Sequence, residues 1–223
     1  MSEPITIDVW SDIACPWCYI GKRNLEKGLA AVSADEDAPQ VEVVFHSFEL
    51  SPDTPVDFDG DELDFLAGHK GMPRDQVRQM LDRVTGVAAD AGLQYRFDIL
   101  KHTNTVKAHE LLHFAKSQGR QHDMAERLMS AYFTEGRHVG RVDDLVALAE
   151  EAGLDPDAAR DALESARHLE DVRADQAQAA AYGINAVPFF VIDGKYGVSG
   201  AQPPEAFARI ARQVWGERRA ADE

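Results

Sequence analysis

The chain contains little cysteine. Cys15 and Cys18 are the only two among 223 residues, and they stand in the stretch SDIACPWCYIG. Two cysteines are too few for a disulfide-rich scaffold, and a reducing compartment disfavours a stable structural bridge. The C-x-x-C spacing is instead typical of a redox pair or of half of a metal site.

Positive charge is also scarce. The chain has 23 Lys and Arg residues against 39 Asp and Glu residues, which gives a formal net charge of −16. Such a field repels phosphate backbones, so we expect no nucleic acid partner. A surface of this kind is typical of an acidic proteome in a high-salt cytoplasm, where counter-ions screen the repulsion between its negative charges. Ordinary acidic proteins share it, so the charge indicates habitat more than function.

Long apolar runs are missing from the sequence. No stretch approaches the roughly 18 to 20 apolar residues that a membrane span needs. The opening MSEPITIDVW lacks the basic segment and apolar run of a signal peptide. We therefore expect a cytoplasmic protein with no membrane partner. Apolar residues make up 44% of the chain and charged residues 28%, a balance that predicts a globular fold of one elaborated domain or two small ones.

The first fifty residues carry a β-α-β pattern. Ile5–Trp10 alternates apolar and polar residues as a strand does, and residues 41–50 are rich in β-branched and aromatic side chains. Residues 16–32 between them have helical spacing, with Pro16 in the first turn, where no N–H is needed. The two cysteines are thus predicted to lie at a strand-to-helix junction.

The chain is predicted to be mostly helical from about Asp61 to Gly183. Apolar residues recur at helical spacing in 72–92, 105–118, 123–133, 142–153 and 155–166. Strand character returns in Val187–Asp193, and the Asp193-Gly194 turn before a second apolar run predicts a hairpin. A last helix over 203–215 completes an α-β-β-α ending.

The CPWC stretch has the residues that dithiol chemistry needs. Exchange passes through the thiolate of one cysteine, which needs a stabilised charge and access. Cys15 is predicted at a helix N-terminus, where unpaired N–H groups and the helix dipole favour an anion, so it is the candidate nucleophile. Cys18 lies one turn further and is the candidate resolving thiol. Pro16 and Trp17 shape the loop, while the nearby Asp12 carboxylate disfavours a thiolate.

The alternative for CPWC is half of a zinc site. Structural zinc usually takes four ligands, and the chain has no further cysteines. We therefore favour a redox pair and expect no metal.

Several stretches together resemble one known family. CPWC after ITIDVWSDIA, the helical middle and the late AVPFFVIDGKYGVSGAQ are similar to the DsbA family of thioredoxin-fold oxidoreductases. NTVKAH and LAEEAGLD resemble its cytoplasmic FrnE-like branch. The resemblance runs from Ile5 to about Trp215. It implies an α/β protein in which residues 1–55 and 170–223 form a thioredoxin-like domain and residues 56–169 form an all-helical insertion between the β-α-β and α-β-β-α units.

The resemblance also implies a substrate site. It implies that the Val187-Pro188 bond is cis and faces the sulfurs, although only about 5–6% of X–Pro bonds are cis and an ordinary strand-start proline is the alternative. Pro188 would then shape the site, and the backbone of Val187 would pair with an incoming cysteine-containing segment. Pro16 and Trp17 would contact the same substrate.

Related proteins of this superfamily use glutathione on small molecules. Kappa-class glutathione transferases and 2-hydroxychromene-2-carboxylate isomerases have a serine near the position of Cys15, and they tend to carry Gly-Ser-Asp where this chain has Gly200-Ala201-Gln202. Both departures favour electron exchange here. In the glutathione-dependent alternative, Asn104, His109 and Gln202 would bind a small substrate.

A second motif competes with CPWC. His109-Glu110-Leu111-Leu112-His113 matches H-E-x-x-H, the spacing of zinc proteases. The two histidines share the helix face opposite the apolar stripe, but any pair at i and i+4 does so. The longer zinc motif fails beyond His113, which we expect at the surface. Asn104 and His109 match the FrnE-like branch and are candidates to line a cleft, where His109 would stabilise a thiolate or carry a proton. Asn104 as a helix N-cap and His109 as a structural residue stay open.

The sequence therefore predicts a thiol–disulfide oxidoreductase that acts on thiol- or disulfide-containing proteins or small molecules. It is expected to need no bound cofactor, with glutathione as one candidate co-substrate. The alternatives are a glutathione-dependent isomerase or transferase and a holdase chaperone that uses the helical insertion as a binding surface.

Overall fold

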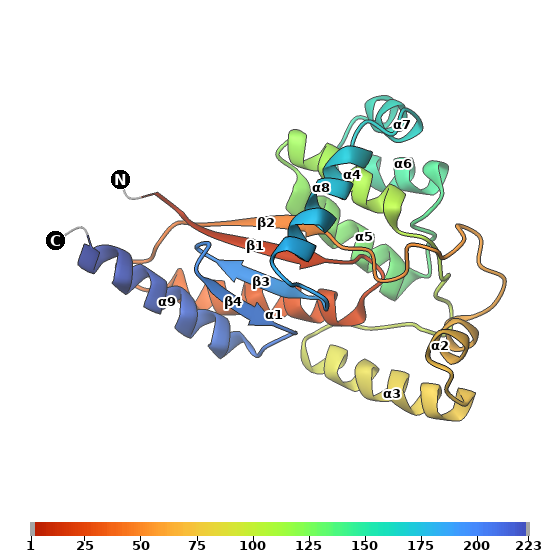
Figure 1. Ribbon diagram of the computed structural model, residues 1–223, viewed down its shortest axis with the longest axis horizontal. Helices are drawn as coiled ribbons and strands as arrows, with labels where there is room; N and C mark the ends of the chain where they lie inside the picture. The colour runs from red at the N-terminus through yellow and green to blue at the C-terminus, as the bar shows by residue number, and fades with distance from the viewer. Residues whose placement is uncertain (1–2, 222–223) are drawn as a thin grey trace.

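The computed structural model describes residues 3–221, which form four strands and nine helices (Figure 1). The strands are β1 (Ile5–Ser11), β2 (Val41–Ser47), β3 (Phe189–Ile192) and β4 (Tyr196–Ser199). The helices are α1 (Pro16–Val32), α2 (Glu62–Lys70), α3 (Arg74–Asp90), α4 (Val106–Ser117), α5 (Gln121–Glu135), α6 (Val142–Glu151), α7 (Pro156–Glu164), α8 (Leu169–Ala181) and α9 (Pro204–Ala221). The predicted β-α-β start, helical middle and α-β-β-α ending are all present.

The strands form one mixed sheet in the order β2-β1-β3-β4. β1 pairs parallel with β2 and antiparallel with β3, which pairs antiparallel with β4. Asp193 and Gly194 both have positive φ, at 58° and 63°, and the Lys195 N–H donates to the Ile192 carbonyl at 3.1 Å. These values define a type I′ turn, whose twist suits a tight hairpin. The predicted hairpin is confirmed.

The sheet is covered by helices on both faces. Ile5, Ile7 and Val9 of β1 belong to the main buried cluster, together with side chains of α1 and α9. Trp10 belongs to a second cluster with Ala179 of α8. This alternation follows from the two-residue period of a strand. The arrangement is a thioredoxin-like fold with additional helices between β2 and β3.

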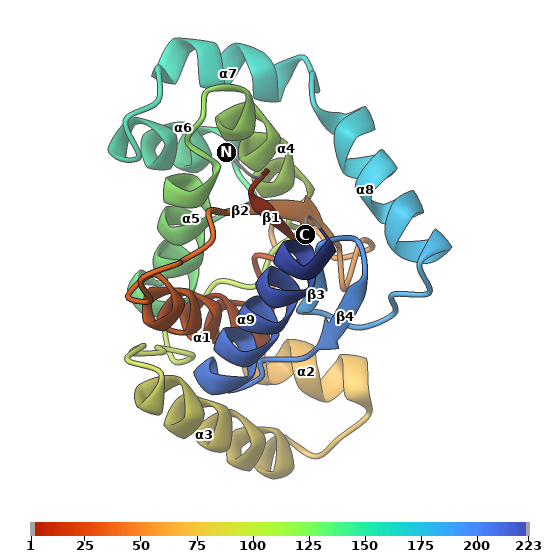
Figure 2. The ribbon, with the colours of Figure 1, turned by 90° about the vertical axis from the view of Figure 1, so that its left-hand side faces the viewer.

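Helices α1 and α9 pack side by side at a glycine (Figure 2). A Cβ added at Gly28 would lie 2.6 Å from the Pro204 carbonyl oxygen and 2.9 Å from Cβ of Phe207. Any larger residue would push the helices apart, so the close packing requires glycine here.

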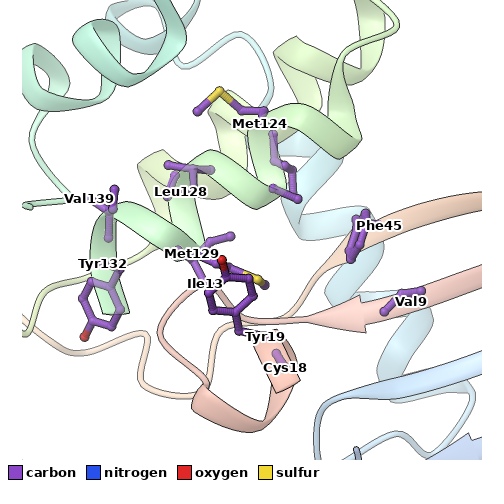
Figure 3. Close-up of a cluster of buried hydrophobic side chains, with 14 of the residues drawn as sticks. Val9, Ile13, Cys18, Tyr19, Phe45, Met124, Leu128, Met129, Tyr132 and Val139 are labelled. Atoms are coloured by element: carbon purple, nitrogen blue, oxygen red, sulfur yellow. The ribbon is translucent and has the colours of Figure 1, made fainter. Parts of the chain in front are cut away.

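The helices between β2 and β3 form two groups on opposite sides of the molecule (Figures 1 and 2). Helices α4 to α7 pack against one another, with α4 in contact with α5, α6, α7 and α8, while α2 and α3 pair separately. One buried cluster joins Val9 and Phe45 of the sheet to Met124, Leu128 and Met129 of α5 (Figure 3). Because this core is continuous, the predicted division into domains of 1–55 with 170–223 and of 56–169 stays a prediction.

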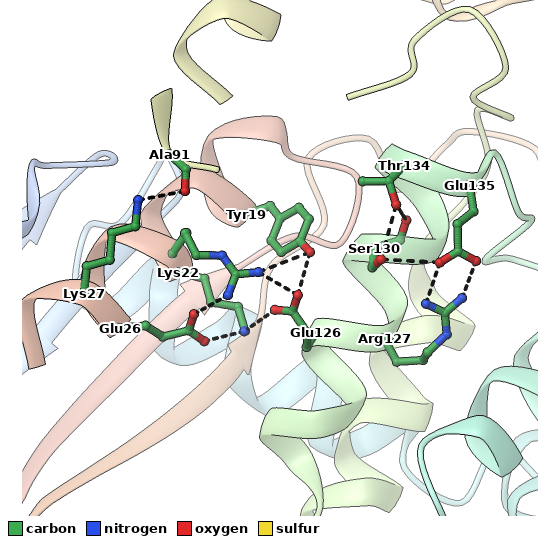
Figure 4. A network of polar contacts seen from close by, with 11 residues as sticks. Tyr19, Lys22, Glu26, Lys27, Ala91, Glu126, Arg127, Ser130, Thr134 and Glu135 are labelled. Carbon is green, nitrogen blue, oxygen red and sulfur yellow. Dashed lines mark hydrogen bonds and ion pairs between the residues drawn. The ribbon is translucent and has the colours of Figure 1, made fainter. Parts of the chain in front are cut away.

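A polar network also ties α1 to α5 (Figure 4). The ammonium group of buried Lys22 lies 2.5 Å from a carboxylate oxygen of Glu126 and 2.5 Å from one of Glu26. The Tyr19 hydroxyl donates to the other oxygen of Glu126 at 2.7 Å. The buried cation is therefore compensated, as a charge in a protein interior must be.

Candidate active site

The two cysteines lie where β1 passes into α1. Cys15 is the N-cap of α1 with an extended backbone (φ −90°, ψ 113°), and Pro16 is the first helical residue. The Cys15 N–H donates to the Asp12 carbonyl at 3.2 Å, and the Cys18 N–H donates to the Cys15 carbonyl at 3.0 Å. The Tyr95 hydroxyl donates to the Pro16 carbonyl at 2.6 Å and so holds the loop from outside. The predicted strand-to-helix junction is confirmed.

The two sulfurs have different surroundings. Cys15 and Cys18 are 3% and 2% exposed and both belong to the main buried cluster, in which Figure 3 shows Cys18, but of the two only Cys15 lines the pocket described below. Burial raises the pKa of the Cys18 thiol well above its ordinary value, and the neighbouring Cys15 raises it further. Cys18 is thus held as a thiol away from the pocket that Cys15 lines, as a resolving cysteine would be.

A proline loop faces Cys15. The Val187–Pro188 bond is cis, as the resemblance implied, and the Cys15 thiol donates to the Val187 carbonyl with Sγ 3.7 Å from the oxygen. α1 approaches this loop at Gly21, where an added Cβ would lie 2.9 Å from Cγ of Pro188. Close packing between α1 and the proline loop therefore sets the position of the Val187 carbonyl beside the sulfur.

The pocket beside Cys15 has a volume of about 490 Å³. One wall is the loop from Ala14 to Trp17 together with Val187, and the other comes from α2 and α3. The remaining lining residues are Asp12, Leu50, Ser51, Phe97, His102, Thr103 and Thr105. Trp17 is 42% exposed. The expected placement of Pro16, Trp17 and Val187 beside the nucleophile is what the structure has, while their contact with a substrate stays a prediction.

His109 lies behind this pocket rather than on its surface. It is 0% exposed, and its Nε2 lies 3.4 Å from Oδ1 of Asp12. Oδ2 of Asp12 also accepts the Leu50 N–H at 2.8 Å. Burial alone would raise the pKa of Asp12, but the hydrogen bond and charge of His109, with the Leu50 N–H, hold it below its ordinary value. The pair thus keeps a carboxylate three residues before Cys15 charged yet locally compensated.

Asn104 and Gln202 do not line this pocket either. The Asn104 side chain accepts the Val106 N–H at 2.9 Å and donates to the Pro52 carbonyl at 2.9 Å. The N-cap of α4 is Thr105, so the N-cap alternative for Asn104 is wrong by one position. The Gln202 side chain donates to the Ser199 carbonyl at 2.8 Å. Both hold loops in place, and their proposed substrate contacts stay predictions.

The second histidine of H-E-x-x-H corrects one expectation. His113 is 8% exposed, so the prediction of a surface residue is wrong. α4 is buried from Ala108 to Ala115 because other helices and the sheet surround it. Nε2 of His113 lies 3.0 Å from Oδ2 of Asp175 and 3.1 Å from Oγ of Ser47. The two histidines of the motif therefore contact different carboxylates, and within residues 3–221 no group of three or more His, Cys, Asp or Glu side chains is arranged to hold a metal.

Sequence reasoning missed the residues that complete the pocket. His102 is buried, and its Nδ1 lies 2.8 Å from Oε2 of Glu62, the first residue of α2. Its ring stacks on Phe65 with centroids 3.4 Å apart. Forty positions separate His102 from Glu62, and no local pattern in the sequence links them.

The fold and the C-x-x-C pair define a thioredoxin-like protein with two free cysteines at the start of α1. The model of the DsbA-like thioredoxin domain matches residues 6–211, so the chain belongs to the family of DsbA-like thioredoxin domains.

Two proteins are similar enough to this chain in sequence to belong to the same family. A probable DsbA oxidoreductase of Streptomyces coelicolor, SCO1869, is 42% identical, and its crystal structure superposes with a TM-score of 0.88 over 96% of this chain and 91% of that one. The uncharacterized protein YwbO of Bacillus subtilis (strain 168) is 31% identical over 211 residues, which are 92% of this chain and 94% of YwbO.

A third protein is similar in fold alone. The cytosolic disulfide reductase DsbM of Pseudomonas aeruginosa is 20% identical, with a TM-score of 0.65 over 94% of this chain and 98% of its own. Among the described residues, none of the helices combines the length and apolar character needed to cross a bilayer.

Proposed function

We propose that this protein is a thiol–disulfide oxidoreductase in which Cys15 is the nucleophile and Cys18 the resolving thiol. The observation that carries the proposal is the unequal placement of the two sulfurs. Both sulfurs are buried, but Cys15 lies at the helix N-terminus and lines a pocket beside the Val187 carbonyl, whereas Cys18 does not line this pocket. An attacking thiol needs access and a stabilised thiolate, and a resolving thiol needs proximity and shelter from other disulfides.

The exchange takes two steps. The Cys15 thiolate attacks one sulfur of a substrate disulfide R–S–S–R′, so that a bond forms to Sγ and R′–S⁻ leaves with the electron pair. Cys18 then gives its proton to solvent and attacks Sγ of Cys15, which forms the Cys15–Cys18 disulfide and releases R–S⁻. Two electrons have passed from the protein to the substrate, and a thiol pool restores the dithiol by the same steps in reverse.

The electron donor or acceptor in this proposal is a thiol or disulfide, not a bound cofactor. Glutathione is one candidate co-substrate, and the natural partners are thiol- or disulfide-containing proteins or small molecules. The proposed location is the cytoplasm, which the resemblance to the FrnE-like branch supports.

Two cysteine variants test the proposal. Cys15→Ser is expected to abolish insulin reduction by dithiothreitol above the uncatalysed rate, because the nucleophile is lost. Cys18→Ser is expected to accumulate mixed disulfides in cells, because the first step proceeds and the second cannot. Catalysed insulin reduction that survives in Cys15→Ser would sink the redox mechanism.

The Asp12–His109 contact supports a positioning role for His109. Without this partner the Asp12 carboxylate would oppose the thiolate three residues away. His109→Gln is expected to slow alkylation of Cys15 by iodoacetamide at pH 7, and the double variant Asp12→Asn/His109→Gln is expected to restore the rate, because the opposing charge is then gone. A double variant as slow as His109→Gln would point to a packing effect instead.

The apolar pocket beside Cys15 favours one second candidate, a glutathione-dependent isomerase or transferase. That activity would need Cys15 at most as a glutathione-binding group, so it would persist in Cys18→Ser. Recovery of glutathione adducts alone from this variant would favour the second candidate over protein exchange. Protection of a client protein from aggregation in the absence of both cysteines would instead support a holdase.

A further inference from the structure

We propose that the pocket beside Cys15 binds a small disulfide or thiol with an apolar body and an anionic end. This inference rests on the proposed exchange function and assigns its substrate class. The apolar lining of the pocket, the unpaired Lys70 and the fixed ring of His102 support it.

The apolar part of the pocket faces the reactive sulfur. Phe65, Met80, Leu81 and Val84 of α2 and α3 lie across from Cys15 in the lining. A volume of about 490 Å³ falls within the range of roughly 300–1,000 Å³ that is common for small-molecule sites. A ring or short alkyl group would therefore be buried here when its sulfur reaches Cys15.

A lysine lines the pocket of this strongly acidic chain. The two acidic side chains of the lining each have a histidine partner, since Asp12 contacts His109 and Glu62 contacts His102. Lys70, at the end of α2, also lines the pocket and makes no ion pair with any described residue. In a chain of net charge −16, an uncompensated cation at a pocket attracts an anion selectively.

His102 supplies a second polar group with a fixed direction. The Glu62 carboxylate holds Nδ1 at 2.8 Å, and the stack on Phe65 restricts the ring plane. Nε2 has no hydrogen bond to a described residue, and the ring lines the pocket. With Nδ1 held by Glu62, Nε2 remains available for a hydrogen bond to a polar group of the substrate.

Three symmetric disulfides that differ in charge and in apolar character test these two features of the pocket separately. The anionic aromatic probe is 5,5′-dithiobis(2-nitrobenzoate), the uncharged aromatic probe is 4,4′-dithiodipyridine, and the cationic aliphatic probe is cystamine. The reduced protein is mixed with each in a stopped-flow instrument, and the rate constant of thiol release is measured. In wild type, Cys15 exchanges with each probe by the two steps given above.

Lys70→Gln and His102→Gln are each expected to lower the rate constant for the anionic probe about 5- to 10-fold and to change that for 4,4′-dithiodipyridine less than 2-fold. Lys116→Gln, which makes the same charge change at an exposed site outside the pocket, is the matched control and is expected to behave as wild type. Equal losses with all three probes, or an equal loss in Lys116→Gln, would overturn the inference. Equal losses in insulin reduction would assign the pocket to protein substrates and overturn it as well.

A non-reactive probe separates this inference from the proposed function. Calorimetry with the Cys15→Ser/Cys18→Ser variant is expected to detect 2-naphthoate and not 2-naphthylmethylammonium. If naphthoate binds but wild type shows no catalysed exchange, the function fails and the anion-selective pocket stands. If exchange proceeds but neither compound binds, the pocket inference fails alone.

Discussion

His46 should make the stability of this protein depend on pH in the alkaline range. Its Nδ1 lies 2.7 Å from Asp175 of α8, and its Nε2 lies 2.8 Å from Asp8 of β1. Trp10 stacks on the ring with centroids 4.5 Å apart. Burial lowers the pKa of His46, but the hydrogen bonds to Asp175 and Asp8 outweigh it and raise the pKa from 6.5 to about 9.

The contribution of His46 to stability follows from the difference between its ordinary pKa and its pKa in the folded protein. At about 1.4 kcal/mol for each pH unit, a rise from 6.5 to about 9 corresponds to about 3 kcal/mol. Since the folded-state pKa is the higher one, the contribution is complete below pH 6.5, declines as the pH rises and is gone above about pH 9. His46 connects β2 to β1 and α8, so loss of its contribution should weaken the packing of α8 on the sheet.

Urea unfolding of wild type and His46→Gln, measured from pH 6 to pH 9.5, checks this prediction. The difference between their unfolding free energies is expected to shrink by about 3 kcal/mol over this range. His122→Gln is the matched control, because Nε2 of His122 contacts the Val43 carbonyl and no carboxylate. A difference between wild type and His46→Gln that stays constant with pH would refute the reasoning.

In acid, Asp175 of the same network should make the stability of the protein fall as the pH falls. Burial opposes ionisation of Asp175, but the hydrogen bonds from His113 and His46 hold its pKa below the ordinary 3.8. Its contribution is therefore present above about pH 4 and is lost as the pH falls further.

Three further changes have expected outcomes. Gly21→Ala should cost about 1 to 3 kcal/mol in urea unfolding and slow insulin reduction, because the new methyl group would press on Pro188 at 2.9 Å. Gly86→Ala should stabilise by about 0.5 to 1 kcal/mol, because its Cβ would meet no atom within 4 Å on helix α3. Glu126→Gln should cost about 2 kcal/mol, because it removes one carboxylate partner of the buried Lys22.

Each destabilising variant has a matched control. Gly21→Ala and Gly86→Ala make the same chemical change in two helices, so equal effects would refute the packing argument at Pro188. For Glu126→Gln, the reference is Glu217→Gln, which breaks an exposed ion pair with Lys195 and should leave the urea midpoint unchanged. A midpoint equally low in both would show that burial of the cation does not matter.

Several elements of this protein could be predicted from the sequence because interactions between neighbouring residues decide them. The alternation in Ile5–Trp10 and the apolar spacing of 16–32 predicted β1 and α1 because strand and helix periods act over a few residues. Pro16 marked the first turn of α1 and so placed Cys15 at its N-terminus. The Asp193-Gly194 pair predicted the hairpin because its backbone angles are a property of those two residues.

Other parts depended on family resemblance rather than on periodicity. The cis bond before Pro188 follows no local rule and was expected only because of the similarity to the DsbA family. α2, by contrast, has a local signal in the sequence: Asp61 and Asp64 form a capping box at its start, with Asp61 accepting the Asp64 N–H at 2.7 Å.

Only the tertiary structure decided which polar residues are buried and what they contact. The helical wheel of α4 predicted one exposed face, yet His109 and His113 are buried because the sheet and neighbouring helices cover that face as well. Their partners, Asp12 and Asp175, lie 97 and 62 positions away along the chain. The sequence by itself determined the dithiol and its helix, because those follow from short-range geometry. The pocket beside Cys15 depends on where α2 and α3 pack, which is a property of the whole folded chain.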